Sequence, residues 1–188
     1  MNFKFTKIES RFLGKLVLFT TIAWPVGIIT AIGLSHIVGE IFDLQSTNLL
    51  VGLVLGFVVA YSQWIVIKKH LKISSWWVYA ASVGVGIPFI LEFILSIIFG
   101  IEDRIIENEI LNHSVVMLLG GFITGLLQYQ IFKLLTPKYK WWIVISALAW
   151  GLAFPGLMLA GVINGLITGF AILWILELPL QSDSTGIN

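Results

Sequence analysis

Long runs of apolar residues, separated by short polar segments, fill most of the chain after residue 15. About 20 apolar residues in a helix cross a bilayer core of about 30 Å. The sequence therefore predicts six membrane-spanning helices, at Leu16–Ile37, Leu49–Ile67, Trp76–Phe99, Ser114–Leu135, Trp141–Leu159 and Val162–Leu178. The pattern predicts an all-α membrane protein with a single six-helix transmembrane domain at 16–178. This domain consists of the hairpins 16–67, 76–135 and 141–178, preceded by a basic N-terminal segment at 1–15 and followed by a tail at 179–188.

The last two predicted helices form one continuous apolar stretch, 141–178, which is too long for a single span. Asn164 and Gly165 lie near its middle, and such residues favour turns. They lie close to Gly161, and we place the break between the two helices just before them, between Leu159 and Val162. Three prolines lie in the first, third and fifth predicted helices, where each removes a backbone hydrogen bond and favours a kink: Pro25, Pro88 and Pro155.

The basic residues predict the orientation of this topology. Cytoplasmic loops of membrane proteins carry an excess of Lys and Arg. Ten of the eleven basic residues fall on one side, and only Arg104 falls on the other. We therefore expect both termini to be cytoplasmic. The ten residues are Lys4, Lys7, Arg11 and Lys15 before the first helix, Lys68, Lys69 and Lys72 after the second, and Lys133, Lys138 and Lys140 after the fourth.

Composition narrows the class of protein further. The mean hydropathy is +0.98 and only 11% of the residues are charged, whereas soluble domains carry about a quarter charged residues. The chain has no cysteine, and it contains no G-x-S-x-G, H-E-x-x-H or P-loop motif. His36 and His113 are predicted outside and His70 inside, so they do not form one metal site. We predict no enzyme, cofactor, metal or nucleic-acid partner.

Residues 56–89 recur without a gap as residues 121–154. The matched positions include Gln63 with Gln128, Lys68 with Lys133, and the pair Trp76–Trp77 with Trp141–Trp142. A partial third copy, Gly165-Leu-Ile-Thr-Gly169, repeats Gly121-Phe-Ile-Thr-Gly125, with Ile172 at the glutamine position. Ala23–Trp24 also echoes Ala149–Trp150. Because each copy spans two helices, we expect three parallel two-helix repeats that share one orientation.

The chain resembles a family of small bacterial polytopic membrane proteins, frequent in cyanobacteria, with repeated G-x3-G-x2-Q-[WY] helices followed by a basic turn and a Trp pair. Here the motif is Gly56/Ala60/Gln63/Trp64 with Lys68, and Gly121/Gly125/Gln128/Tyr129 with Lys133. The resemblance covers about residues 50–155, and the sixth helix departs from it because it lacks the glutamine. It implies a helical fold in a bacterial inner membrane and supplies no activity and no catalytic residue.

The motif places small residues and a glutamine on one helix face, since positions 0, +4 and +7 lie within about 60° of one another. Small residues let helices approach closely in lipid, and an amide can hydrogen-bond across the contact. We assign helix packing to Gly56, Ala60, Gly121, Gly125, Gly165 and Gly169. The two glutamines have two interpretations. Gln63 and Gln128 either join helices together, or face each other across a pseudo-symmetry axis and bind a ligand or ion.

Glu92 is the one carboxylate well inside a predicted span. A charged group there is costly and marks a functional site by default, with His36 and His113 as candidate partners. The alternative is a protonated side chain, or one that reaches to the membrane surface. Four tryptophans at the starts of the third and fifth helices are expected to anchor in the membrane interface, where an indole ring is favoured: Trp76, Trp77, Trp141 and Trp142.

These patterns predict a non-enzymatic integral membrane protein that serves as an accessory or scaffold subunit of a membrane complex. Its expected partners are the lipid bilayer and another membrane protein or a second copy of the chain. The alternative is a small-molecule, lipid or ion binding or transport module with a polar site inside the helix bundle. A polar cavity lined by Glu92, Gln63 or Gln128 would favour the alternative, and a closed core would favour the scaffold.

Overall fold

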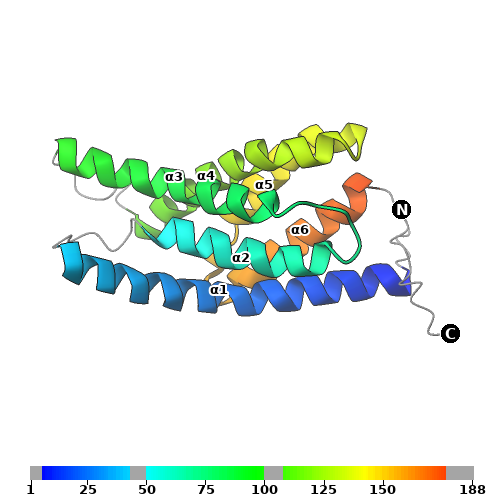
Figure 1. Cartoon of the computed structure of the whole chain (residues 1–188), viewed down its shortest axis with the longest axis horizontal. Coiled ribbons are helices and arrows are strands. Elements are labelled where there is room, and N and C mark those ends of the chain that lie inside the picture. The colour runs from blue at the N-terminus through cyan, green and yellow to red at the C-terminus, as the bar shows by residue number, and fades with distance from the viewer. Residues whose placement is uncertain (1–5, 43–49, 100–107, 177–188) are drawn as a thin grey trace.

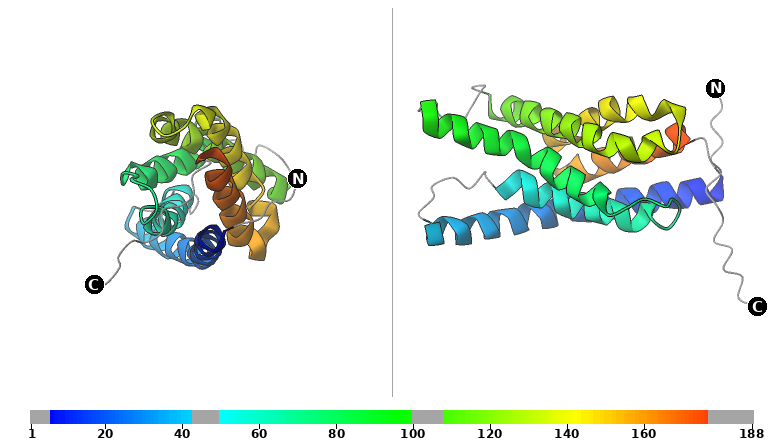
Figure 2. Two further views of the ribbon diagram at one scale, coloured as in Figure 1. Left: turned by 90° about the vertical axis from the view of Figure 1, so that its right-hand side faces the viewer. Right: turned by 45° about the horizontal axis from the view of Figure 1, so that its top comes forward.

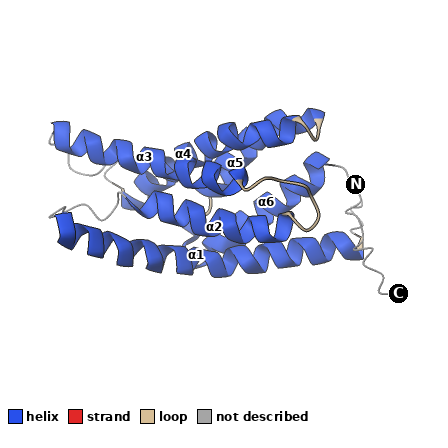
Figure 3. Ribbon diagram, viewed as in Figure 1, coloured by secondary structure: helices blue, strands red, loops and turns tan. Residues whose placement is uncertain are grey.

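The computed structural model describes residues 6–42, 50–99 and 108–176. Within these residues the chain is all-helical, without a strand (Figure 3). Two 3-10 helices, η2 (Pro137–Lys140) and η3 (Phe154–Leu159), flank α5. The six α-helices are α1 (Lys7–Phe42), α2 (Val51–Ile67), α3 (Trp76–Phe99), α4 (Glu109–Lys133), α5 (Trp141–Gly151) and α6 (Ala160–Leu176). The prediction of an all-helical chain is confirmed, and the tail 179–188 lies outside the described residues.

Three helices are long and apolar enough to cross a membrane: α1 over Lys7–Glu40, α3 over Trp76–Leu95, and α4 over Glu109–Lys133. The helices α2 and α6 are equally apolar but shorter. Large apolar side chains cover the outside of the bundle, including Leu18, Ile22, Ile29 and Ile32 along α1. Soluble monomers rarely expose contiguous apolar surface on this scale. The helices and their surface are compatible with an integral membrane protein.

The six helices form a ring in which each helix packs on the next along the chain and α6 returns to α1 (Figure 2, left). The start of α1, the α2–α3 turn, η2 and the end of α6 lie together at one end of the bundle (Figure 1). The described basic residues all belong to these segments or, in the case of Lys133, to the last turn of α4, which leads into η2. They are Lys7, Arg11, Lys15, Lys68, Lys69, Lys72, Lys133, Lys138 and Lys140. Lys4 and Arg104 lie outside the described residues.

The first helix begins earlier than predicted because a capping box fixes its start. The Thr6 backbone N–H donates to Glu9 Oε2 at 2.7 Å, and the Glu9 N–H donates to Thr6 Oγ1 at 3.2 Å. This reciprocal pair satisfies two of the free N–H groups at a helix start. The basic segment that precedes Leu16 is therefore helical from Lys7 onward. It extends α1 out of the apolar part of the bundle at the basic end.

The break between the fifth and sixth helices lies earlier than the sequence predicted. The helix α5 ends at Gly151, and η3 contains Pro155, whose missing N–H prevents an α-helix from continuing. The predicted turn residues Asn164 and Gly165 lie inside α6, so that prediction was wrong. Asn164 lies among apolar residues because its side chain is fully buried between helices, and not because the chain turns there. The helix α6 also begins well short of the far ends of α1 and α3 and runs from there to the basic end (Figure 1).

Candidate functional site

The repeated glycines lie where helices of the ring come closest. A Cβ added to Gly56 on α2 would lie 2.6 Å from the Ala81 carbonyl oxygen of α3. One added to Gly121 on α4 would lie 2.5 Å from the Ser146 carbonyl oxygen of α5, and one added to Gly165 on α6 would lie 2.9 Å from a Cα atom of α1. Each side chain would collide with backbone, so only glycine permits these contacts.

The other three predicted packing residues also lie within the bundle. A Cβ on Gly125 would lie 2.7 Å from the Ile143 Cα of α5. One on Gly169 would lie 2.5 Å from a side-chain carbon of Leu13 on α1. Ala60 is buried in the apolar cluster at the basic end. The glycines therefore approach helices of the same chain.

The three glycine contacts share one register. Opposite Gly56, Gly121 and Gly165, the nearest Cα atoms belong to Ser82 on α3, Ala147 on α5 and Val17 on α1. Five residues before each of these lies a buried aromatic side chain, namely Trp77, Trp142 and Phe12. The sequence comparison aligned Trp24 with Trp150, but the glycine contacts do not place these two residues at equivalent positions. The two rings instead touch each other, with centroids 5.8 Å apart.

Gln128 lies buried in α4 and bonds to two neighbouring helices. Its Nε2 donates to the Trp77 carbonyl oxygen of α3 at 2.9 Å. Its Oε1 accepts from the Trp142 indole Nε1 of α5 at 3.0 Å. The ring of Trp142 packs on Phe132 and Trp77, with centroids 4.5 and 5.3 Å apart. Both ends of this amide are therefore used in joining α3, α4 and α5.

Gln63 occupies the repeat-related position of α2 but bonds across the bundle. Its Nε2 donates to Asn164 Oδ1 on α6 at 2.8 Å, and Asn164 Nδ2 donates to the Ala149 carbonyl oxygen of α5 at 3.1 Å. The helices α2 and α6 are not neighbours in the ring. The two glutamines thus bond to different partners and not to each other. The sequence did not reveal Asn164 as an interior hydrogen-bonding residue, although it is the one amide side chain in the described part of the apolar helix α6.

The four tryptophans divide into two exposed and two buried side chains. Trp76 and Trp141 are 45% and 56% exposed, as expected of anchors at an interface. Trp77 and Trp142 are buried, so the prediction that all four are anchors was wrong for these two. Successive side chains on a helix point about 100° apart. One member of each pair therefore faces outward while the other packs in the core.

Glu92 lies buried on α3, and its partner is an amide on the neighbouring helix. Asn112 Nδ2 of α4 donates to Glu92 Oε1 at 2.9 Å. The predicted histidine partners are engaged elsewhere. His36 pairs with Glu40 at 3.3 Å on the exposed surface of α1, and the ring of His113 stacks on another aromatic side chain. The structure therefore joins Glu92 to the residue directly before His113.

Three cavities in the described part of the structure lie on the outside of the ring. One of about 260 Å³ lies between α1 and α2, one of about 490 Å³ between α1 and α6, and one of about 350 Å³ at the basic end. Gln63, Gln128 and Glu92 line none of these three. Among the described residues, no group of three His, Asp or Glu side chains is placed to hold a metal ion.

No family model, curated protein or solved structure matches the chain. Its function is therefore argued from the geometry alone.

Proposed function

We propose that the chain is a six-span protein of a bacterial inner membrane, built from three parallel hairpins, α1–α2, α3–α4 and α5–α6. The support is the shared register of the glycine contacts that join α2 to α3, α4 to α5, and α6 to α1. The gathering of the described basic residues at one end supports cytoplasmic termini. The short helices α2 and α6, and α5 together with η3, cross the bilayer as members of this ring, each flanked on both sides by other helices.

Within that membrane, the protein acts as a non-enzymatic accessory or scaffold subunit. The observation that carries this proposal is the use of the interior amides. Gln128 bonds at both ends to neighbouring helices, and Gln63 and Asn164 bond to each other. Polar groups of a ligand site are left free to meet the ligand, whereas these groups hold the bundle closed. The outer surface is then what the protein offers to lipids and other proteins.

Purification from the native membrane tests this proposal. The tagged chain, extracted in mild detergent, should retain one membrane protein in a fixed molar ratio. That ratio should persist when the tag is moved to the partner. An unrelated six-span protein, tagged and purified in the same way, is the control and should not retain the partner. A chain that purifies alone with a stoichiometric small molecule would contradict a scaffold role.

The buried pair of Glu92 and Asn112 favours a second candidate function, the binding of a cation or proton inside the bundle. Buried carboxylates in membrane helices frequently serve such pathways. Glu92→Gln is the sharp variant because its amide oxygen still accepts from Asn112 while the charge is lost. Under this candidate, sodium or potassium ions raise the thermal stability of the wild type and not of Glu92→Gln. Equal responses of the two proteins would eliminate the binding of either ion at Glu92.

A further inference from the structure

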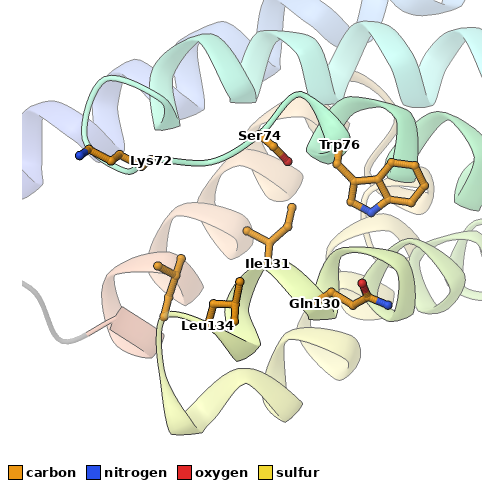
Figure 4. Close-up of a pocket in the computed structure, with 7 residues that line it drawn as sticks. Lys72, Ser74, Trp76, Gln130, Ile131 and Leu134 are labelled. Atoms are coloured by element: carbon orange, nitrogen blue, oxygen red, sulfur yellow. The ribbon is translucent and has the colours of Figure 1, made fainter.

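A pocket of about 350 Å³ lies at the basic end, between the α2–α3 turn and the last turns of α4 (Figure 4). The turn contributes Lys72 and Ser74, the start of α3 contributes Trp76, and α4 contributes Gln130 and Ile131, followed by Leu134 and Leu135. Its lining thus combines three polar side chains with an indole ring and three aliphatic side chains.

The local structure holds the polar side of this pocket in place. Ile73 is buried, and its carbonyl oxygen accepts from the Trp64 indole Nε1 at 3.3 Å. This pins the turn to the bundle and leaves Lys72 and Ser74, on either side of Ile73, exposed. The Trp76 indole Nε1 donates to the Leu127 carbonyl oxygen at 3.0 Å. The wall formed by this ring is therefore fixed before any ligand arrives.

The polar side chains of the pocket are available for hydrogen bonds to a ligand. The side chains of Lys72, Ser74 and Gln130 make no hydrogen bond or ion pair with any other described residue. Figure 4 shows Lys72 at one edge of the pocket, with Trp76 and Gln130 at the other. The ammonium and the hydroxyl on the turn are suited to the oxygens of a phosphate group, and the amide on the opposite wall is suited to a polar group next to that phosphate.

The apolar side of the pocket faces out of the bundle. Leu134 follows the end of α4 and is 87% exposed, and Leu135 is also exposed. Exposed leucines beside Lys72 and Lys133 are costly in water but favourable at the boundary between headgroups and acyl chains. The pocket thus presents cationic and apolar surface together, at the end of the bundle that carries the described lysines.

We propose that this pocket binds the headgroup of an anionic phospholipid in the cytoplasmic leaflet. Lys72 and Ser74, which lie on the same turn, contact the phosphate oxygens. Gln130 on the opposite wall contacts the hydroxyls of the headgroup, and Ile131, Leu134 and Leu135 contact the upper acyl chains. The argument for this occupant is charge complementarity, since anionic lipids attract basic residues next to a membrane span. The inference rests on the membrane placement proposed above.

Native mass spectrometry of the full chain in detergent tests the site. The probes are phosphatidylglycerol and phosphatidylcholine with identical acyl chains. The wild type should bind one phosphatidylglycerol at least fivefold more tightly than phosphatidylcholine, and Lys72→Gln should lower that affinity about fivefold, the effect of one cationic contact. The matched control is Lys15→Gln, which removes the same charge from an exposed position on α1. It should change the affinity less than twofold.

Three outcomes would overturn the inference. Equal binding of the two lipids, or equal losses in Lys72→Gln and Lys15→Gln, would show a diffuse electrostatic effect. Full competition by soluble glycerol phosphate would show that the pocket takes a free phosphate and not a lipid. Extraction of membranes with alkaline carbonate separates this inference from the proposed function. Release of the chain by carbonate contradicts the membrane placement itself, whereas retention without lipid preference contradicts only the lipid site.

Discussion

Gln128 and Gln63 occupy the same position of the internal repeat, and both are buried, yet their surroundings differ. Gln128 bonds to the two helices beside it, through the Trp77 carbonyl oxygen and the Trp142 indole. Gln63 turns across the ring to Asn164. By the alignment of the glycine contacts, Trp77 occupies the position relative to Gln63 that Trp142 occupies relative to Gln128. The Trp77 indole N–H is buried and has no hydrogen-bond partner in the described structure.

A single residue on another helix accounts for the difference. Asn164, which directly precedes Gly165 on α6, offers Gln63 an acceptor. The residues that directly precede the equivalent glycines of α4 and α2 are Gly120 and Leu55, which have no polar side chain. At the third site both polar groups are gone, with Ile172 at the glutamine position and Phe12 at the tryptophan position. The glutamine–tryptophan hydrogen bond therefore forms at the first site, is replaced by a bond to Asn164 at the second, and is replaced by apolar packing at the third. A residue can thus recur at the same position of a repeat while its bonding partner changes.

The largest expected effect concerns the feature that both regions share, the close glycine contacts. Gly121→Leu and Gly56→Leu each force a side chain into the backbone of the next helix. Each should lower the free energy of unfolding by about 3 kcal/mol or prevent folding, at the upper end of overpacking effects. Unfolding by titration with dodecyl sulfate in mixed micelles measures this. The control is Gly14→Leu, whose Cβ meets no atom within 4 Å. A stable Gly121→Leu protein would contradict the packing.

The next effect separates the two glutamines. Gln128→Leu leaves the Trp142 N–H and the Trp77 carbonyl oxygen without their partner, so it should cost about 2 kcal/mol of unfolding free energy. Gln63→Leu should cost about 1 kcal/mol, because Asn164 keeps its bond to the Ala149 carbonyl oxygen.

A double-mutant cycle between Gln63→Leu and Asn164→Leu checks that assignment by the same dodecyl sulfate titration. The two changes should be coupled, since each removes one end of the same hydrogen bond. Additive effects would show that the bond contributes nothing to stability. Gln128→Leu combined with Asn164→Leu is the matched pair without a shared bond and should be additive.

The smallest effect is also the most discriminating. Trp142→Phe and Trp77→Phe each leave a cavity in the core, which lowers the unfolding free energy of both variants. Trp142→Phe also removes the donor to Gln128, whereas Trp77→Phe removes an N–H that is buried without a partner, so Trp142→Phe should lose about 1 kcal/mol more. The two variants make the same change in volume at matching positions, which makes each the control for the other. Equal losses would mean that Trp77 has a partner as well.

The sequence could predict the features that depend on local pattern. The lengths of the apolar runs predicted six helices. The spacing from Gly56 to Gln63, and likewise from Gly121 to Gln128, predicted the packing face, since both features depend on periodicity along one helix. It could not predict the partner of Gln63 or of Glu92, because these bonds join residues 101 and 20 positions apart. The burial of Trp77 depends likewise on which helices flank α3, and the end of α5 was missed because Asn164 was given a role in a turn.

Labelling of single cysteines in sealed vesicles tests most directly whether α2, α3 and α4 cross the membrane in the proposed directions, because the chain has no cysteine of its own. Lys69→Cys and Lys140→Cys lie at the basic end, whereas His36→Cys and Glu109→Cys lie at the other, all at exposed positions. An impermeant maleimide should label the first two only in inside-out vesicles and the last two only in right-side-out vesicles. Labelling of Lys69→Cys and Lys140→Cys from opposite sides would contradict the account.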